Sequence, residues 1–276
     1  MLIDTHCHLD ADAFDADRDA VVARARAGGV TMMVLPAGHA EHFETTAAVA
    51  HRYGLAYALG THPLWIDRAV EAHVDLLRET ARRALADARF VAIGEIGIDG
   101  VVAGLDPARQ QWFFREQLKV ARDLDLPVIV HVRRSADLLL KHLRQIRVSG
   151  GIVHAFNGSR EQANALLGLG LRLGFGGAMT YAGSLRIRRF AATLPDDAWV
   201  LETDAPDIPP HWLYQTQAQR QSGQGVLKQN RNEPGELAQI GAVLAQLRGL
   251  EPSAVALATV QNTLRVLPQL AHIYST

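Results

Sequence analysis

The sequence opens with Met1-Leu2-Ile3-Asp4-Thr5-His6-Cys7-His8-Leu9-Asp10, a short apolar run that leads directly into two histidines. A short run rich in β-forming residues is typical of a buried strand, and the polar residues mark where it ends. Similar runs recur along the chain, separated by longer stretches of helical pattern. Strands are expected at residues 2–5, 31–36, 56–60, 91–94, 128–130, 151–153, 172–174 and 199–201.

Helical patterns fill the intervals between these runs. Gly28-Gly29 closes the first helix, and Asp106-Pro107 opens the fourth with an N-cap residue and a proline at the first helical position. No linker or low-complexity segment interrupts the alternation. Helices are expected at residues 16–27, 40–53, 70–86, 107–124, 136–145, 160–167 and 184–193, with a final pair at about 233–248 and 252–267.

Eight strands that alternate with helices predict an α/β protein built as a (β/α)8 TIM barrel, with additional C-terminal helices. The alternative is an open, doubly wound parallel sheet. Closure is favoured by the number of strands and because no G-x-G-x-x-G sequence follows the first one. A length of 276 residues is usual for one such barrel, so a single domain over residues 1–276 is expected.

Composition narrows the class of protein further. Hydrophobic residues make up 48% and charged residues 21%, which is compatible with a large soluble core. No apolar run reaches the roughly 18 residues needed to cross a bilayer. Cys7 is the single cysteine, which rules out an internal disulfide framework, so a cytoplasmic protein is expected. No membrane association and no obligate protein partner are expected either. The net charge of −1 argues against extensive wrapping of duplex DNA, but a few arginines beside a reactive centre could still contact nucleic acid.

Polar residues gather where the predicted strands end, which is where a barrel builds its active site. One histidine at a strand end is usually structural, but several other histidines of this chain fall in predicted helices, so the joint pattern favours a metal site. Imidazole and carboxylate ligands suit zinc or manganese and, with more oxygen ligands, magnesium. The residues are His6, His8, His62, Glu95, His131, His154 and Asp204.

Six of these residues, all but His62, are too many ligands for one tetrahedral ion that keeps an open position. Two divalent ions bridged by a carboxylate use them economically, and Glu95 is the expected bridge. His6 and His8 project to the same side of a strand, whereas Cys7 points away and is expected to be a small buried hydrophobe. All three lysines fall in predicted helices or a late loop, which excludes a carbamylated-lysine bridge if the strands are as predicted.

These strand ends carry a family resemblance. The motifs, in chain order, resemble those of the TatD-type deoxyribonuclease family within the amidohydrolase superfamily, and they span nearly the whole chain. The chain departs from the family pattern at residues 100–104, where aromatic residues are usual, at Asn157, where serine is commoner, and in a long glutamine-rich loop after Asp204. The motifs are Ile3-Asp4-Thr5-His6-Cys7-His8-Leu9-Asp10, Gly94-Glu95-Ile96-Gly97-Ile98-Asp99, Pro127-Val128-Ile129-Val130-His131, His154-Ala155-Phe156-Asn157-Gly158-Ser159, Glu202-Thr203-Asp204-Ala205-Pro206 and Asn232-Glu233-Pro234.

The resemblance implies a TIM barrel that uses divalent metals to hydrolyse phosphodiester bonds of DNA. By position it makes metal ligands of the six residues above, and it places His62 near the substrate phosphate. Water whose pKa a metal lowers from 15.7 to roughly 7 would supply the nucleophilic hydroxide. Asp204 would orient it or accept its proton, and Glu202 would support the site from behind. Arg133, Arg134 and Arg160 are candidates for gripping a substrate backbone.

Two other readings of the sequence stay open. The same metal chemistry serves amide, lactone and other ester bonds, so a different amidohydrolase activity is the main alternative. A catalytically silent barrel that binds metal or a partner is the other, although none of the six candidate ligands is lost.

Overall fold

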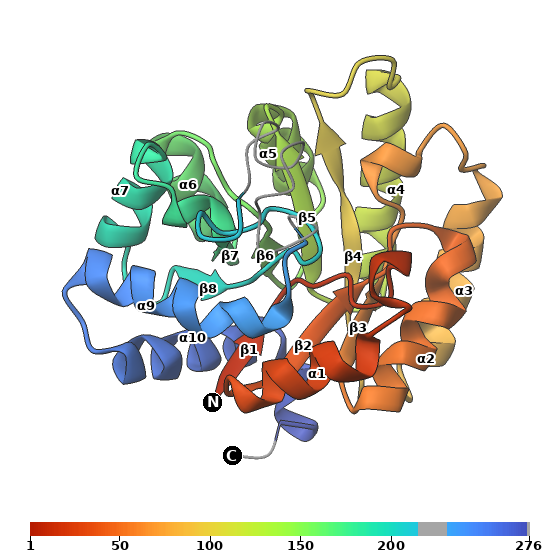
Figure 1. Ribbon diagram of the computed structural model, residues 1–276. Helices are drawn as coiled ribbons and strands as arrows, with labels where there is room; N and C mark the ends of the chain where they lie inside the picture. Colours follow the sequence, from red (N-terminus) through yellow and green to blue (C-terminus); the bar gives the residue numbers. More distant parts are fainter. Residues whose placement is uncertain (215–230, 275–276) are drawn as a thin grey trace.

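The computed structural model describes residues 1–214 and 231–274. Within them, eight parallel strands pair in chain order from β1 to β8, with helices outside the sheet (Figure 1). This order confirms the predicted (β/α)8 barrel and excludes the open doubly wound sheet. The strands are β1 (Leu2–Asp4), β2 (Val30–Pro36), β3 (Ala56–Leu59), β4 (Phe90–Asp99), β5 (Val128–Arg133), β6 (Gly151–Val153), β7 (Leu171–Phe175) and β8 (Trp199–Leu201).

The helices of the described residues follow the strands and begin at recognisable caps. Asp106 accepts hydrogen bonds from the amides of Ala108 and Arg109 ahead of α4, as its position before Pro107 predicts. Ser159 and Gln162 form a capping box at the start of α6. The helices are α1 (Arg18–Ala27), α2 (Phe43–Tyr53), α3 (Ala72–Ala84), α4 (Pro107–Asp123), α5 (Ala136–Gln145), α6 (Arg160–Gly168), α7 (Leu185–Thr193), α9 (Leu237–Arg248) and α10 (Pro252–Val266).

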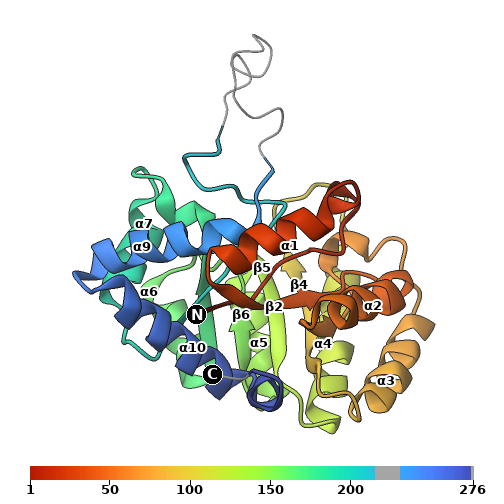
Figure 2. The ribbon, with the colours of Figure 1, turned by 60° about the horizontal axis from the view of Figure 1, so that its bottom comes forward.

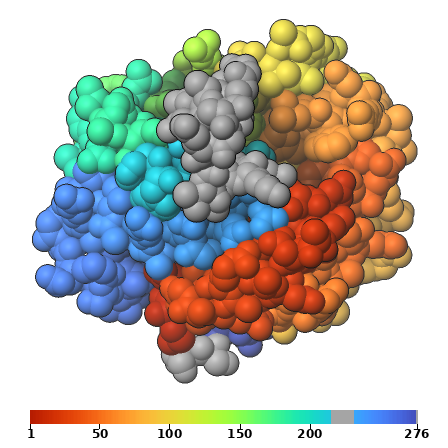
Figure 3. Space-filling view, viewed as in Figure 1, coloured from red at the N-terminus to blue at the C-terminus, as the bar shows by residue number. Residues whose placement is uncertain are grey.

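Backbone hydrogen bonds at the carboxyl ends of the first and last strands join these two strands and close the barrel there. The Thr5 amide donates to the Leu201 carbonyl at 3.1 Å, and the Asp204 amide donates to the His6 carbonyl at 2.8 Å. The predicted C-terminal helices cover this seam, because α10 packs against both β1 and β8. The first strand and the last α-helix therefore lie side by side, as Figures 2 and 3 show for the red and blue segments.

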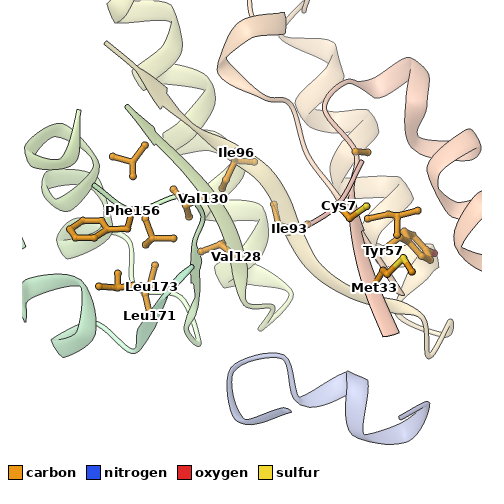
Figure 4. Close-up of a cluster of buried hydrophobic side chains, with 14 of the residues drawn as sticks. Cys7, Met33, Tyr57, Ile93, Ile96, Val128, Val130, Phe156, Leu171 and Leu173 are labelled. Atoms are coloured by element: carbon orange, nitrogen blue, oxygen red, sulfur yellow. The ribbon is translucent and has the colours of Figure 1, made fainter. Parts of the chain in front are cut away.

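Two buried clusters hold the barrel together. The larger lies between the sheet and the surrounding helices, and it includes Cys7, Ile93 and Phe156 (Figure 4). The smaller combines Ile3, Val34, Val200 and other strand residues with Leu267 and Leu270 beyond α10. Cys7 is thus a free, fully buried thiol in the outer core, as its place between two histidines predicted.

β4 and β5 extend further than the sequence predicted, so Glu95 and His131 lie inside strands and not after them. Glycine explains the difference. A Cβ at Gly94 would lie 2.6 Å from Cβ of Ile129, and one at Gly97 would lie 2.1 Å from the His131 carbonyl oxygen. These glycines allow β5 to approach β4 closely; they do not end the strand.

The remaining predictions concern a late loop, the three lysines and membrane-spanning helices. The glutamine-rich loop, with Lys228 in it, falls on residues 215–230, which lie outside the described residues. The other two lysines lie on helices: Lys119 pairs with Glu116 on α4, and Lys141 belongs to α5. Among the described residues, no helix combines the length and the apolar character needed to cross a membrane.

Candidate metal centre

His6 and His8 follow β1 and project to the same side of the chain. Their Nε2 atoms lie 3.2 Å apart, and the side chain of His6 is fully buried. Two imidazole nitrogens that face each other this closely suit ligands converging on one ion. Cys7, between them, points into the outer core, as the alternation of an extended chain requires.

Glu95 stands between two groups of imidazoles. Its Oε2 lies 3.2 Å from Nε2 of His6 and 3.6 Å from Nε2 of His8. Its Oε1 lies 3.2 Å from Nδ1 of His131 and 3.4 Å from Nε2 of His62. Each carboxylate oxygen therefore faces different imidazoles, as a carboxylate shared between two ions would require.

Asp204 completes the centre from the segment after β8. Its Oδ1 lies 3.6 Å from Nε2 of His6, 3.7 Å from Nε2 of His8 and 3.6 Å from Nε2 of His154. The other ring nitrogen of His154, Nδ1, lies 3.0 Å from Oε1 of Glu202. Glu202 thus sits behind His154, which leaves Nε2 facing the centre.

The donor set fits divalent cations. The ligand atoms within each of three overlapping groups lie within 4.8 Å of one another. Among the described residues, the ion-pair partners of Glu95 and Asp204 are all histidines, and no lysine or arginine neutralises these buried acids. Two buried carboxylates surrounded by imidazoles leave negative charge and ring lone pairs for a cation to satisfy. The groups are His6–Glu95–His154, His6–His8–Asp204 and His62–Glu95–His131.

The pKa values of the cluster reflect burial among competing charges. Burial, followed by the influence of His154, lowers the pKa of His6 to about 3, so this ring is neutral near pH 7. Burial raises the pKa of Asp204 to about 6 against the opposing effect of His154 and His8. For His154, burial acts to lower the pKa, but Glu202 and Asp204 raise it to about 10.

His62 lies in the cluster, but its hydrogen bonds distinguish it from a ligand. Its Nδ1 accepts a hydrogen bond from the Leu64 amide at 3.1 Å, so Nδ1 carries no proton. A neutral ring must then carry its proton on Nε2, the atom 3.4 Å from Oε1 of Glu95. His62 therefore presents a donor to the centre.

The structure places one further acid here that the sequence analysis did not single out. Oδ2 of Asp99 lies 3.0 Å from Nε2 of His131. Burial acts to raise the pKa of Asp99, but hydrogen bonding to His131 and to backbone amides lowers it overall. The signal was in the sequence: Asp99 follows Glu95 by four residues, and alternate residues of a strand share a face.

The three candidate arginines are placed differently. Arg133 is half-exposed, with Nη1 3.3 Å from Oδ2 of Asp99. Arg134 follows it on the surface at φ 50°. Arg160, at the start of α6, donates to the Thr193 hydroxyl and lies over the Phe190 ring, so it is directed toward α7 and away from the cluster.

Comparison with known proteins relates this centre to a family. A family model described as TatD related DNase matches residues 3–268. The chain is 39% identical over 265 residues to an "uncharacterized metal-dependent hydrolase", YjjV of Escherichia coli K12, with 95% of each chain covered. It is 34% identical over 274 residues to the "3'-5' ssDNA/RNA exonuclease TatD" of Cronobacter sakazakii, with 96% of this chain and 97% of that one covered.

Solved structures agree with this relationship. The crystal structure of YjjV, a TatD homologue, superposes with a TM-score of 0.86 at 36% identity, covering 97% of this chain and 98% of that one. A lactonase of Deinococcus radiodurans, at 17% identity and a TM-score of 0.65, shares the fold alone.

The barrel and its buried cluster of imidazoles and carboxylates define a metal-dependent hydrolase. The family match and the relatives above 30% identity make the relationship more specific. The chain belongs to the TatD family.

Proposed function

We propose that this protein hydrolyses phosphodiester bonds of DNA with two divalent ions. The ions, zinc, manganese or magnesium, would be held by the six candidate ligands and bridged by Glu95. The observation that carries the proposal is that Oε2 of Glu95 faces the ring nitrogens of His6 and His8 while its Oε1 faces Nδ1 of His131. The name of the Cronobacter relative, an exonuclease of single-stranded DNA and RNA, supports nucleic acid as the substrate class.

Bound divalent ions would lower the pKa of water and polarise the phosphoryl oxygens. Asp204 accepts or directs the proton of the attacking water, because its carboxylate lies against the cluster but keeps 12% of its side-chain surface exposed. His62 directs its Nε2 proton at a phosphoryl oxygen from the other side of Glu95.

The surrounding residues position these groups and the substrate. Glu202 orients the ring of His154. Arg133 and Arg134, at the end of β5, offer guanidinium groups to the substrate backbone. Arg160 is a weaker candidate for this contact, because its side chain packs against α7. Residues 1–276 act as one catalytic domain, in the cytoplasm and without an obligate protein partner.

A small recess opens beside Asp204, next to these groups. It encloses about 280 Å³, including its open mouth, and its walls include Phe156, Ile187 and Ile208. Gly177 also lines the recess, and its backbone packs so closely against residue Ile208 that an added Cβ would lie 2.1 Å from the Ile208 carbonyl oxygen.

The test is a metal-dependence assay on defined substrates. The purified protein is stripped with a chelator, reloaded separately with Mg²⁺, Mn²⁺ or Zn²⁺, and assayed on single-stranded DNA, plasmid DNA and a panel of amides and lactones. We expect chelation to abolish cleavage of DNA and at least one of the ions to restore it. A protein that turns over a lactone and leaves every phosphodiester intact would overturn the nuclease assignment in favour of the amidohydrolase alternative.

A further inference from the structure

Asp99 is the last residue of β4, and its two carboxylate oxygens have different partners. Oδ1 accepts hydrogen bonds from the amides of Val101 at 2.7 Å and Val102 at 2.9 Å. Oδ2 lies 3.0 Å from Nε2 of His131 and 3.3 Å from Nη1 of Arg133. The hydrogen bonds that shape the turn after β4 use Oδ1 alone. The contact between Oδ2 and His131 is therefore not explained by the turn.

Gln110 on α4 fixes the position of Asp99. The Asp99 amide donates to Oε1 of Gln110 at 2.7 Å, and Nε2 of Gln110 donates to the Asp99 carbonyl at 3.2 Å. Gln110 is 2% exposed, so both of these bonds are shielded from water. The helix thereby holds the end of the strand in register, and the Asp99 carboxylate cannot drift away from the ring it faces.

The opposite side of the His131 ring faces the centre. Nδ1 of His131 lies 3.2 Å from Oε1 of Glu95. Both ring nitrogens of His131 thus face a carboxylate. A cation on the Glu95 side requires the ring proton on Nε2, where Asp99 accepts it, which leaves the lone pair on Nδ1 for the ion. We propose that Asp99, held by Gln110, is a positioning residue that fixes the ring and tautomer of His131 for metal binding.

The inference rests on the proposed role of His131 as a metal ligand, and Asp99→Asn tests it. The two turn amides require an acceptor, so the Asn oxygen remains beside them and its NH2 group faces Nε2 of His131. Glu95 is then the one carboxylate left beside the ring, so the proton of His131 favours Nδ1, the atom that should bind the ion. We expect the affinity for Zn²⁺ to fall about 10- to 100-fold, the usual effect of losing such a partner.

Two measurements follow the change without using catalysis. Zn²⁺ is titrated into the metal-stripped protein in competition with a chromophoric chelator, and ¹⁵N spectra of the histidine-labelled metal-free protein report the tautomer of His131. The matched control is Asp87→Asn, which removes a carboxylate 2.7 Å from Nε2 of His51 at the other end of β4. We expect the control to keep wild-type Zn²⁺ affinity and an unchanged His131 signal.

The outcomes separate this inference from the proposed function. If His131→Ala binds Zn²⁺ as the wild type does, the ligand assignment fails. If His131→Ala loses a metal and Asp99→Asn keeps both the affinity and the tautomer of the wild type, the role of Asp99 alone is overturned. If Asp99→Asn does not fold, the Zn²⁺ affinity of Gln110→Ala is measured in its place. An affinity lower than that of the wild type supports the inference, and an unchanged affinity overturns it.

Discussion

The buried carboxylate of Asp204 lies beside three imidazole rings, so we expect its charge to matter more for activity than the size of its side chain. Asp204→Asn keeps the size of the side chain and removes the charge and the proton acceptor. We expect kcat to fall about 10²- to 10⁴-fold, the range for losing general acid–base catalysis. Assays on single-stranded DNA at saturating metal measure this, with thermal melting to show that the fold is retained.

The control for that prediction lies three residues further along. Asp207 is exposed, and its backbone amide donates to the Asp204 carbonyl, so Asp207→Asn changes a charge nearby without touching the cluster. It should retain wild-type turnover. An Asp204→Asn protein as active as Asp207→Asn would refute the role given to Asp204.

The candidate site could be predicted residue by residue wherever a polar side chain follows an apolar run. His6, His8, His154 and Asp204 come together because the strands are parallel and their carboxyl ends share one rim. The partners that select a tautomer could not be foreseen in this way. That Leu64 donates to Nδ1 of His62 depends on the turn after β3, which local composition does not specify.

At the scale of elements, the close approach of β4 and β5 brings Glu95 and His131 together. Gly97→Ala would place a Cβ 2.1 Å from the His131 carbonyl oxygen, so the two strands must separate there. We expect a loss of about 1–3 kcal/mol in the free energy of unfolding, the range for overpacking, together with weaker Zn²⁺ binding. Urea denaturation and Zn²⁺ titration measure the two effects.

Gly168→Ala is the control for this prediction, because no atom lies within 4 Å of the added Cβ and the residue ends α6. It should leave metal binding unchanged. Stability equal to wild type in Gly97→Ala would contradict the steric account of this strand pair.

The lengths of β4 and β5 show why boundaries were harder to predict than elements. Glycine is typical of turns, so Gly94 and Gly97 indicate a turn when the sequence is considered alone. The sequence does not reveal that a neighbouring strand fills the space left by their missing side chains. The helix caps were readable because a cap depends on residues close in sequence, such as Asp106 and Pro107.

At the scale of the whole molecule, metal binding and folding are coupled. The centre buries Glu95 and Asp204 without a lysine or arginine partner among the described residues, so bound cations should stabilise the folded state selectively. We expect chelation to lower Tm and stoichiometric Zn²⁺ to restore it, as differential scanning fluorimetry can measure. In Glu95→Gln the rise in Tm with Zn²⁺ should be much smaller; an equal rise would place the stabilising metal elsewhere.

The start of the chain is also tied to its late segment by an ion-pair network outside the barrel. Arg231 donates to both carboxylate oxygens of Asp17, at 2.8 and 2.7 Å, and Arg24 pairs with Glu233 at 2.8 Å. Helix α1 is therefore attached to the segment that leads into α9, beside the seam where β8 meets β1. Such a network contributes to stability only while its acids are ionised.

The pH dependence of stability should reveal this network. Hydrogen bonding from Arg231 lowers the pKa of Asp17 from 3.8 to about 2, against a smaller opposing effect of burial. A lowered folded-state pKa means that the contribution is complete above about pH 4 and is lost as the pH falls toward 2. We expect Asp17→Asn to lose up to about 1 kcal/mol at neutral pH, a modest value because Asp17 is about one-third exposed, and its difference from the wild type to shrink below pH 4. Urea denaturation across pH 2.5–7 measures the difference.

The control is Asp67→Asn, which changes an exposed acid in the segment before α3 and should show no such difference. If the difference between wild type and Asp17→Asn stays constant through the acid range, the Asp17 charge does not contribute to stability.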